Sequence, residues 1–475
     1  MVSEMFGFLN SEQLQKIHDT SLRILEQVGI VFDHHSALKL LKDAGASIDF
    51  SKSMARIPPY LVEEAIKKTP KEVKLHARNT KYDLVYKQGK TYAHSGGGTV
   101  GILDSDSGAL REASQEDLEK GVRLVDALEN LSTNRPCVYP KDFPPKVRDI
   151  HTMAHMLQNT EKHCNINTYT STNLEYIIKI VKAVFGGDEE LRKKNYVDGT
   201  ISPTKPLQYA YEDVNILTKY VEHGIPIDLC PCPITGVTTP ITLAGALAHQ
   251  NSSVLAGILL TQLINLGNPV IYTTRIFTMD MHSGASLLGA IETGIMSVGI
   301  AQLAKYYGIP SDVYGLGTDS NTLDETTAFE KSLSGLLPAL AGANCISGAG
   351  MLGSGLIFSL EQLVIDNEIL SMILRSIRGI DVEDETLAYD VISEAGSGGV
   401  FLSTSHTRDH FKKEHFIRKL ASRAVWEKMN AKNITEVAKA EVKKVLAEHI
   451  VSPVDKDVQY NVEKILKEAE KNLIK

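Results

Sequence analysis

Short apolar runs alternate with longer helical patterns between about residue 90 and residue 380. The short runs are rich in β-branched, small or aromatic residues, which favours strands, and the longer runs repeat their apolar residues at helical spacing. The predicted strands are 91–94, 132–139, 163–170, 196–202, 227–233, 270–277, 312–318 and 344–351. The predicted helices are 115–128, 145–158, 173–186, 211–223, 243–266, 285–307, 325–341 and 360–378.

This alternation predicts an α/β fold with a parallel sheet. Eight strand–helix units in this stretch predict a (β/α)₈ TIM barrel over 89–380. An open doubly wound sheet would also alternate, but no Gly-x-Gly-x-x-Gly follows the first strand. A hairpin is expected at 101–111, between the first strand and its helix.

Two regions outside the barrel have different patterns. Residues 1–88 predict an N-terminal mixed α/β cap with helices over 10–30, 36–43 and 60–68 and β segments over 73–76 and 82–86. Residues 381–475 are rich in Glu, Lys and Ala and predict a C-terminal helical extension, with helices over 412–430, 435–448 and 455–474.

Composition narrows the class of protein. Of the 475 residues, 43% are hydrophobic and 23% are charged, which is ordinary for a globular protein. The net charge of −8 argues against a general nucleic-acid binder. The first residues lack the pattern of an export signal, and apolar stretches such as 253–266 are interrupted by polar residues and are too short to span a bilayer. Five cysteines in such a chain predict reduced thiols, so we expect a cytoplasmic protein without membrane or nucleic-acid partners.

In a TIM barrel the active site lies where the strands end, and this rule selects candidate residues. His94 precedes three glycines, which would let a ligand approach the backbone or simply form a turn. Arg275 lies near the end of strand 270–277, at the expected barrel mouth, where it would grip a carboxylate or form a structural ion pair. His282 would position substrate or start the next helix. Asp319 and Asn344 are further polar candidates beside the last two strands.

Two further features leave alternatives open. Cys230 and Cys232 stand one residue apart, which is compatible with zinc or redox chemistry and equally with small residues packing the barrel interior. Aromatic rings on the predicted strands would bind a quaternary ammonium by cation–π attraction or serve as ordinary strand formers. These rings are Tyr92, Tyr139, Tyr169, Tyr272, Tyr314 and Phe277.

Three segments resemble the trimethylamine methyltransferase family. They are Cys232 to Ala248, Gly317 to Lys331, and Glu383 to Gly396 with the following Gly399 to His406. The resemblance extends over nearly the whole chain and implies a (β/α)₈ barrel, in agreement with the pattern. Archaeal members carry pyrrolysine, whereas all 475 positions here are standard residues. The chain therefore resembles the non-pyrrolysine branch; the expected pyrrolysine region lies near Asp319 to Glu330.

That branch implies an enzyme that moves a methyl group from a quaternary amine to the Co(I) corrinoid (cobalamin) of a separate protein. Glycine betaine, proline betaine, carnitine and γ-butyrobetaine are the implied substrates, with no metal bound directly. The resemblance assigns no catalytic residue. From the strand map we expect tyrosines around the ammonium and Arg275, with His94 or His282, at a carboxylate. A homo-oligomer is expected. The alternatives are a zinc-dependent corrinoid methyltransferase acting on a thiol or alcohol, and a non-catalytic betaine-binding barrel.

Overall fold

The central architecture is a closed barrel of eight parallel strands, in the order β10-β11-β13-β14-β17-β18-β6-β9. The computed structural model describes residues 6–420 and 433–474. The barrel strands are β6 (Tyr92–Ser95), β9 (Thr133–Asn134), β10 (His163–Ile166), β11 (Val197–Ile201), β13 (Ile227–Leu229), β14 (Val270–Thr274), β17 (Ser311–Tyr314) and β18 (Cys345–Ala349). Each lies within or beside a predicted strand, so the predicted (β/α)₈ TIM barrel is confirmed.

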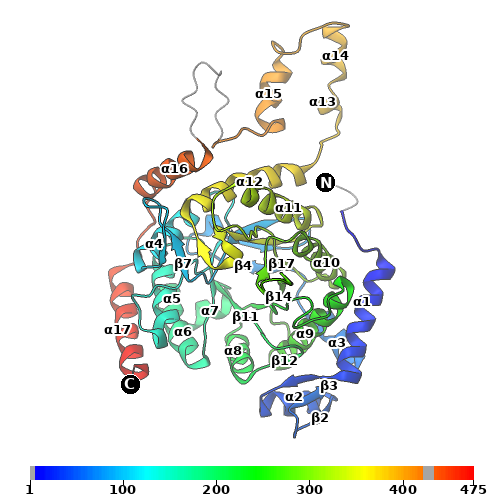
Figure 1. The fold of residues 1–475 in the computed structure, drawn as a ribbon, viewed down its shortest axis with the longest axis vertical. Coiled ribbons are helices and arrows are strands. Elements are labelled where there is room, and N and C mark those ends of the chain that lie inside the picture. The colour runs from blue at the N-terminus through cyan, green and yellow to red at the C-terminus, as the bar shows by residue number, and fades with distance from the viewer. Residues whose placement is uncertain (1–5, 421–432, 475) are drawn as a thin grey trace.

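The barrel helices surround the strands as a ring (Figure 1). They are α4 (Gln115–Ala127), α5 (Arg148–Gln158), α6 (Ser171–Phe185), α8 (Tyr211–Glu222), α9 (Leu243–Ile264), α10 (Ile291–Tyr307), α11 (Glu325–Leu340) and α12 (Leu360–Arg378), with the short α7 (Asp188–Lys193) between α6 and β11. Several begin where side chains accept hydrogen bonds from the first turn, such as Ser114, Thr170, Asp324 and Ser359. Local caps and the apolar pattern therefore agree on where these helices start.

Helix α9 contains the most apolar long segment of the described chain. It has 22 residues and is long and apolar enough to cross a membrane by length and composition, but 78% of its most apolar window is buried inside the protein. It packs against α1 (Ser11–Arg23) and α3 (Pro59–Lys68). The apolar stretch 253–266, predicted to be too short to span a bilayer, overlaps the second half of this longer helix, which is covered by its neighbours.

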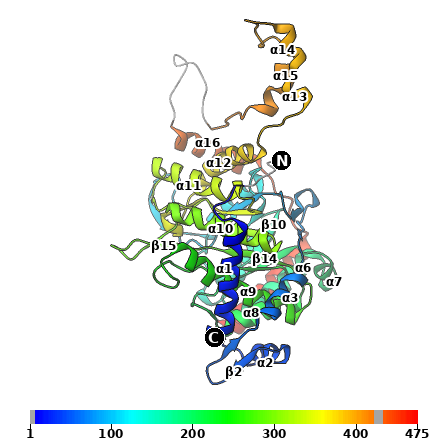
Figure 2. The same cartoon turned by 90° about the vertical axis from the view of Figure 1, so that its right-hand side faces the viewer.

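Short hairpins lie beside the barrel strands. β7 (Gly101–Leu103) and β8 (Leu110–Glu112) form the predicted hairpin, and they join β19 (Met351–Leu352) and β20 (Ile357–Phe358) in a small sheet. β15 (Thr278–Met279) and β16 (Ser286–Leu287) form another hairpin, which projects from the body in Figure 2. The helix predicted over 285–307 therefore begins later, at Ile291, because the residues before it form this hairpin.

The N-terminal cap has the predicted mixed structure. It contains α1, a π-helical turn (Ile24–Val28), β1 (Ile30–Phe32), α2 (His35–Ala44), β2 (Ser47–Asp49), β3 (Met54–Arg56), α3, β4 (Val73–Leu75) and β5 (Leu84–Tyr86). Its four-stranded sheet, in the order β12-β1-β3-β2, takes β12 (Gln208–Tyr209) from the loop before α8. The cap is thereby joined to the barrel by backbone hydrogen bonds as well as by side-chain packing.

The C-terminal region is helical. α16 (Ile434–Glu448) packs on α12 and α4, and α17 (Lys456–Leu473) packs on α6, close to two of the predicted helices. The prediction of a helix over 412–430 differs from the structure, because α15 (Ser405–Glu414) ends near its start and residues 415–420 are not helical. Its remainder, 421–430, lies outside the described residues. Together with α13 (Asp384–Leu387) and α14 (Tyr389–Ala395), α15 forms an arm that extends away from the barrel (Figures 1 and 2).

Candidate active site

A cavity of about 370 Å³ lies at the carboxyl ends of the barrel strands. Residues that follow or end all eight strands line it, which is where active sites of TIM barrels are found. The lining includes His94, Gly96, Gly97, Arg135, Asn165, Thr200, Cys230, Cys232, Arg275, Phe277, Leu288, Tyr314, Ser347, Gly348 and Met351. A larger cavity of about 660 Å³ is lined by residues such as Ser311 and Asn344, at the amino ends of the strands. We assign the site to the smaller cavity because strand-end side chains of contrasting chemistry converge only there among the cavities of the described residues.

Two arginines form the floor of this cavity. Arg135 donates through Nη2 to Asp228 Oδ2 at 2.5 Å and to Asp312 Oδ2 at 2.8 Å, and through Nη1 to Thr200 Oγ1 at 3.0 Å. Arg275 donates through Nη2 to Asp312 Oδ2 at 3.3 Å and to Ser347 Oγ at 3.1 Å. The two guanidinium groups thus share one carboxylate oxygen of Asp312, which is itself buried.

The pKa values of the two floor aspartates, Asp312 and Asp228, are shifted in opposite directions. Although burial opposes it, His94, Arg275 and Arg135 hold the pKa of Asp312 below its ordinary value, so this carboxyl is ionised. Burial, reinforced by Asp198, raises the pKa of Asp228 well above its ordinary value, although Arg135 opposes the shift. Arg135 and Arg275 therefore face Asp312 and, at Arg275 Nη1, the Cys230 sulfur, and Arg275 Nε, which has no hydrogen bond among the described residues, is the donor that remains for a further anion.

His94 is a neutral part of the floor. Its Nδ1 lies 2.5 Å from the Ser95 carbonyl oxygen, and its Nε2 lies 3.0 Å from Arg135 Nε and 3.0 Å from Asp312 Oδ2. Burial and the Arg135 charge lower the pKa of His94. In the neutral ring Nδ1–H donates to the Ser95 carbonyl oxygen and Nε2 accepts from Arg135 Nε, so that Nε2 has no proton for Asp312 Oδ2; a hydrogen bond to Asp312 requires a protonated Nε2.

One wall of the cavity is apolar and aromatic. Leu288, Tyr314 and Met351 form a buried cluster against which Phe277 packs. The rings of Phe277 and Tyr314 meet edge to face, with centroids 5.3 Å apart. The Tyr314 hydroxyl is buried and has no hydrogen-bond partner among the described residues, and burial raises its pKa. A ligand in the cavity therefore meets two aromatic side chains on this side.

Glycines shape both edges of this wall. A Cβ on Gly96 would lie 2.0 Å from Cγ and Sδ of Met351, so the glycine lets the Met351 side chain enter the cavity wall. Gly348 has a φ of +111° and lies where the pairing of β18 with β6 shifts register. The glycines after the first strand therefore serve close packing as well as a turn.

The segment 317–331, one of the three with a family resemblance, contacts the residues of the apolar wall and the loops beside them. Asp319 Oδ1 accepts from the Leu288 backbone at 2.7 Å and from Ser354 Oγ at 2.7 Å, and both partners line the cavity. Glu330 accepts from the Asp319 backbone at 3.0 Å. Lys331 is fully buried and donates to Asp366 Oδ2 at 2.9 Å and to the Leu316 carbonyl oxygen. These charged residues fix the loops that carry the lining.

The structure brings four of the predicted substrate-binding residues to the cavity and places the others elsewhere. His94, Arg275, Phe277 and Tyr314 line it. Asp319 is outside the lining and contacts two residues that belong to it, Leu288 and Ser354. His282 is exposed at the tip of the β15–β16 hairpin, and Tyr169 is 52% exposed and packs on Tyr139, which is outside the lining.

The remaining three predicted residues are corrected by their surroundings. Tyr272 points out of the barrel and donates to Asn251 of α9 at 2.7 Å, because strand alternation gives it the opposite face from the interior. Tyr92 stacks on Tyr86 of the cap strand β5. Asn344 precedes β18 and donates to the carbonyl oxygens of Lys87 and Lys90, at the amino end of the barrel. None of the three contacts the cavity.

Sequence reasoning missed Arg135, Asp228 and Asp312 as parts of the site. Arg135 fell inside the predicted strand 132–139, but the strand ends at Asn134, so Arg135 is a strand-end residue. Asp228 and Asp312 are acids inside otherwise apolar barrel strands. A charged residue within an apolar barrel strand indicates a buried partner of opposite charge and thus a candidate site, because an unpaired charge is costly to bury there.

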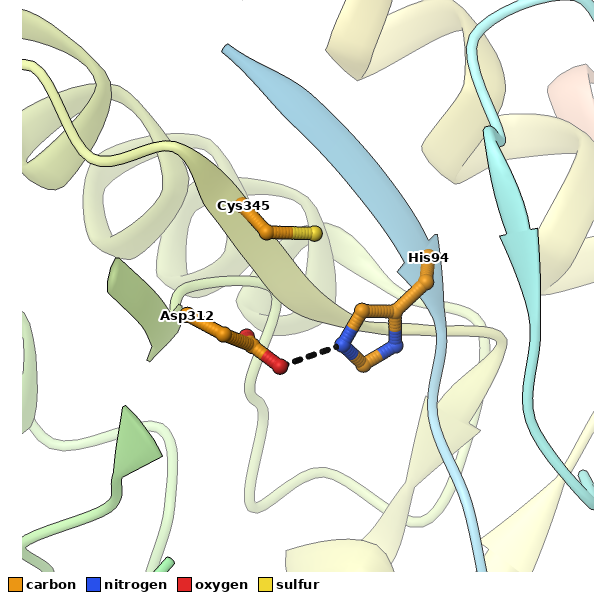
Figure 3. Close-up of side chains that lie close together, drawn as sticks. All are labelled: His94, Asp312 and Cys345. Atoms are coloured by element: carbon orange, nitrogen blue, oxygen red, sulfur yellow. Dashed lines mark hydrogen bonds and ion pairs between the residues drawn. The ribbon is translucent and has the colours of Figure 1, made fainter. Parts of the chain in front are cut away.

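His94, Asp312 and Cys345 come close enough to hold a metal on distance alone, since their ligand atoms all lie within 4.8 Å of one another (Figure 3). Their surroundings do not fit one. Arg135 and Arg275 already contact Asp312, and Arg135 contacts His94, so a dication would lie against two guanidinium groups. Burial also raises the pKa of Cys345 well above its ordinary value, which disfavours the thiolate that zinc requires. We assign no metal to this cluster.

Comparisons with known proteins agree with this architecture. The family model described as trimethylamine methyltransferase matches residues 3–473. A trimethylamine methyltransferase of Desulfitobacterium hafniense (strain DSM 10664 / DCB-2) is 34% identical over 98% of this chain and 95% of its own length. A glycine betaine methyltransferase of Desulfitobacterium hafniense (strain Y51) is 30% identical over 95% of each chain.

A solved structure shows the same fold. The crystal structure of the Methanosarcina barkeri monomethylamine methyltransferase superposes with a TM-score of 0.54, covering 99% of this chain and 88% of that one at 11% identity. The barrel and its strand-end cavity define an α/β enzyme of the TIM-barrel class. The chain belongs to the trimethylamine methyltransferase family and is a methyltransferase, as the resemblance of its motifs predicted.

Proposed function

We propose that the protein transfers a methyl group from a small betaine to the Co(I) corrinoid of a partner protein. Glycine betaine and the related proline betaine, carnitine and γ-butyrobetaine are the candidate substrates. The observation that carries the proposal is the two-sided cavity, with guanidinium groups of Arg135 and Arg275 at its floor and the Phe277–Tyr314 pair on its wall. A betaine has matching ends, because its carboxylate pairs with guanidinium and its ammonium is attracted to aromatic faces.

Arg275 is the better of the two arginines for the carboxylate. Arg135 uses all three of its nitrogens in hydrogen bonds to His94, Thr200 and the two aspartates. Arg275 uses Nη1 and Nη2, and its Nε has no hydrogen bond among the described residues. An incoming carboxylate can therefore gain a charge-assisted hydrogen bond from Arg275 without removing the Asp312 contact.

The reaction of a quaternary amine suits a cavity without an acid. A quaternary ammonium leaves as a neutral tertiary amine, so no proton has to be supplied. No Asp or Glu is among the residues that line the cavity, and His94 is neutral with both ring nitrogens engaged. Co(I) is a strong nucleophile, so what the protein must supply is alignment of the N–CH₃ bond and exclusion of water. The name of one relative supports this chemistry, since it is a glycine betaine methyltransferase.

We also propose a homo-oligomer in the cytoplasm, joined through the α13–α15 arm. Large apolar side chains of the arm are exposed, including Tyr389 at 76%, Val400 at 71% and Leu402 at 83%. The acidic limb, 381–395, already pairs with α15 within the chain, through Lys413–Asp381 and His410–Glu385. The exposed apolar side chains are therefore the part of the arm that a second copy would cover in a two-fold arrangement.

The position of the arm favours a second copy over the corrinoid protein as its partner. The arm follows the carboxyl end of α12, and barrel helices run back towards the amino ends of the strands. In Figure 2 the arm rises from the top of the molecule, well away from β15 at the cavity side. A methyl acceptor has to reach the cavity itself.

Ligand binding tests the substrate proposal without a partner protein. Calorimetric titration should detect glycine betaine, whereas 3,3-dimethylbutyrate, its uncharged-headgroup isostere, and tetramethylammonium, which lacks the carboxylate, should each bind more weakly. Equal affinity for betaine and both analogues would contradict the two-sided site. Failure to bind any betaine would remove the proposed substrate class.

A further inference from the structure

Two cysteines face the cavity at the end of β13. The sequence Cys230-Pro231-Cys232-Pro233 leaves the strand after Leu229, and the two sulfur atoms lie 3.8 Å apart. Both cysteines line the cavity, and Cys232 is partly exposed. A disulfide has an S–S distance of about 2.05 Å, so closing one here requires an approach of about 2 Å. The turn therefore holds two thiols close to bonding distance in a space that small molecules can enter.

Cys230 has the surroundings of a reactive thiol. Its sulfur accepts a hydrogen bond from Arg275 Nη1 at 2.7 Å. The hydrogen bond from Cys232, together with the Arg275 charge, lowers the pKa of Cys230 to about 6. Cys232 itself is affected in the opposite sense, because Cys230 raises its pKa. One thiolate nucleophile thus sits beside one protonated thiol.

The other three cysteines have different surroundings. Cys137, Cys164 and Cys345 are buried, as Cys230 is, but they lack its contact with Arg275. Burial raises the pKa of Cys137 to about 12 and raises those of Cys164 and Cys345 as well. They are outside the lining of the site cavity. They serve as internal controls for any reaction that depends on a thiolate.

We propose that Cys230 and Cys232 are an oxidative modification site, in which a hydroperoxide converts the pair to a disulfide and thereby stops use of the cavity. The Cys230 thiolate attacks the terminal oxygen of the hydroperoxide; an S–O bond forms, the O–O bond breaks, and water or an alcohol leaves after protonation. Cys232 then loses its proton and attacks the Cys230 sulfur, so that the S–S bond forms and the S–O bond breaks with release of water. Overall, two thiols are oxidised and one hydroperoxide is reduced.

The disulfide would change the carboxylate subsite. It removes the negative sulfur that Arg275 Nη1 contacts and draws the Cys-Pro-Cys backbone together beside Arg275. A bound carboxylate and the Cys230 thiolate also compete for the same guanidinium group. Bound betaine should therefore slow the oxidation, and this part of the inference rests on the proposed function.

The test uses the reduced full-length protein without ligand, exposed to a small excess of hydrogen peroxide. Peptide mass spectrometry under non-reducing conditions should find the 230–232 segment lighter by two hydrogens, with Cys137, Cys164 and Cys345 still thiols, and a dithiol reductant should restore it. In Cys232→Ser, the disulfide should be absent and a sulfenic acid at Cys230 should be trapped by dimedone. Oxidation of the three buried cysteines at the same rate, or a 230–232 segment that keeps both thiols, would overturn the proposal.

A second measurement separates this inference from the substrate proposal. Repeating the peroxide exposure with saturating glycine betaine should slow disulfide formation several-fold. Disulfide formation that is insensitive to betaine would retain the modification site and count against the placement of the carboxylate at Arg275. Binding of betaine to the never-oxidised protein tests the substrate proposal independently of the cysteines.

Discussion

Arg135 and Asp312 meet across the interior of the barrel, with Nη2 of the arginine 2.8 Å from Oδ2 of the aspartate. Arg135 follows β9 and Asp312 lies on β17, and these strands are not neighbours in the barrel order. Because Asp312 also accepts from Arg275, one carboxylate positions both guanidinium groups of the cavity floor. The floor is therefore a connected unit, and a change at one member should affect the others.

Removing Arg135 should destabilise the fold strongly. Arg135→Met would leave the ionised Asp312 with less compensation in a buried place, and breaking a buried ion pair typically costs about 3–5 kcal/mol. Arg408→Met, which removes a 76% exposed side chain from an ion pair with Asp409, should cost no more than about 1 kcal/mol. Urea unfolding of the two variants measures the difference. Equal, small losses would show that the floor network does not stabilise the barrel.

Replacing Arg275 should weaken betaine binding selectively. A hydrogen bond to a charged group contributes about 1.5–3 kcal/mol, so Arg275→Gln should raise the dissociation constant of glycine betaine about 10- to 150-fold. Tetramethylammonium has no carboxylate, and its dissociation constant should change little. Calorimetric titration of both ligands checks this. A parallel loss for the two ligands would mean that Arg275 only shapes the cavity.

Replacing Phe277 should act on the other end of the substrate. Phe277→Leu keeps an apolar side chain but removes a ring, and cation–π contacts contribute about 0.5–2 kcal/mol. We expect glycine betaine to bind about 2- to 30-fold more weakly. The isostere 3,3-dimethylbutyrate has no positive charge, and its affinity should be nearly unchanged. If both ligands lose affinity equally, the ring contributes packing and no attraction for the ammonium.

Alkylation of Cys230 should follow an unusually acidic titration. The lowered pKa means that deprotonation is easier in the folded protein than in a free thiol, so the rate with iodoacetamide should rise through about pH 6 and level off above it. An ordinary cysteine would show this rise near pH 8.5. Arg275→Gln removes a guanidinium that favours the thiolate and should move the profile to higher pH. Peptide mapping of the alkylated protein identifies the residue; a rise for Cys230 only near pH 8.5 would contradict the assigned surroundings.

Disrupting the arm should change the oligomeric state and nothing at the cavity. Tyr389→Glu combined with Leu402→Glu places charges on two exposed positions of the arm. We expect a smaller species in analytical ultracentrifugation and unchanged betaine binding. Ile450→Glu alters a position outside the arm that is 83% exposed and is the matched control. An unchanged sedimentation coefficient for the arm variant would place any self-association on another surface.

The barrel could be predicted because each strand–helix unit has a strong local pattern. The first and last residues of a helix were harder to predict where the neighbouring segment also lines the cavity. The apolar run before α10 reads as the start of a helix, but Ser286 and Leu288 belong to the hairpin and loop that line the cavity. The C-terminal arm has no local signal for extending away from the body, since its helices look like any amphipathic segment.

Only part of the site could be predicted, for two physical reasons. The strand-end rule places His94 and Arg275 in the cavity lining because parallel strands bring their carboxyl ends together. The face of each strand is not given by residue type: Tyr272 and Phe277 are both aromatic and close in sequence, but one contacts α9 and the other lines the cavity. The link between Arg135 and Asp228 depends on two distant strands, and no local pattern contains it.

Methyl transfer from a betaine to a corrinoid protein is the reaction proposed for this enzyme, and it can be measured directly. The purified protein, dialysed against a metal chelator and kept reduced, is mixed with a Co(I) corrinoid on its cognate carrier. Glycine betaine, proline betaine, carnitine, γ-butyrobetaine and trimethylamine are added separately, and the visible spectrum is followed. We expect at least one betaine to methylate the corrinoid without added metal, and trimethylamine not to methylate it. Methylation by trimethylamine alone, or by a betaine only after zinc is restored, would contradict the proposal.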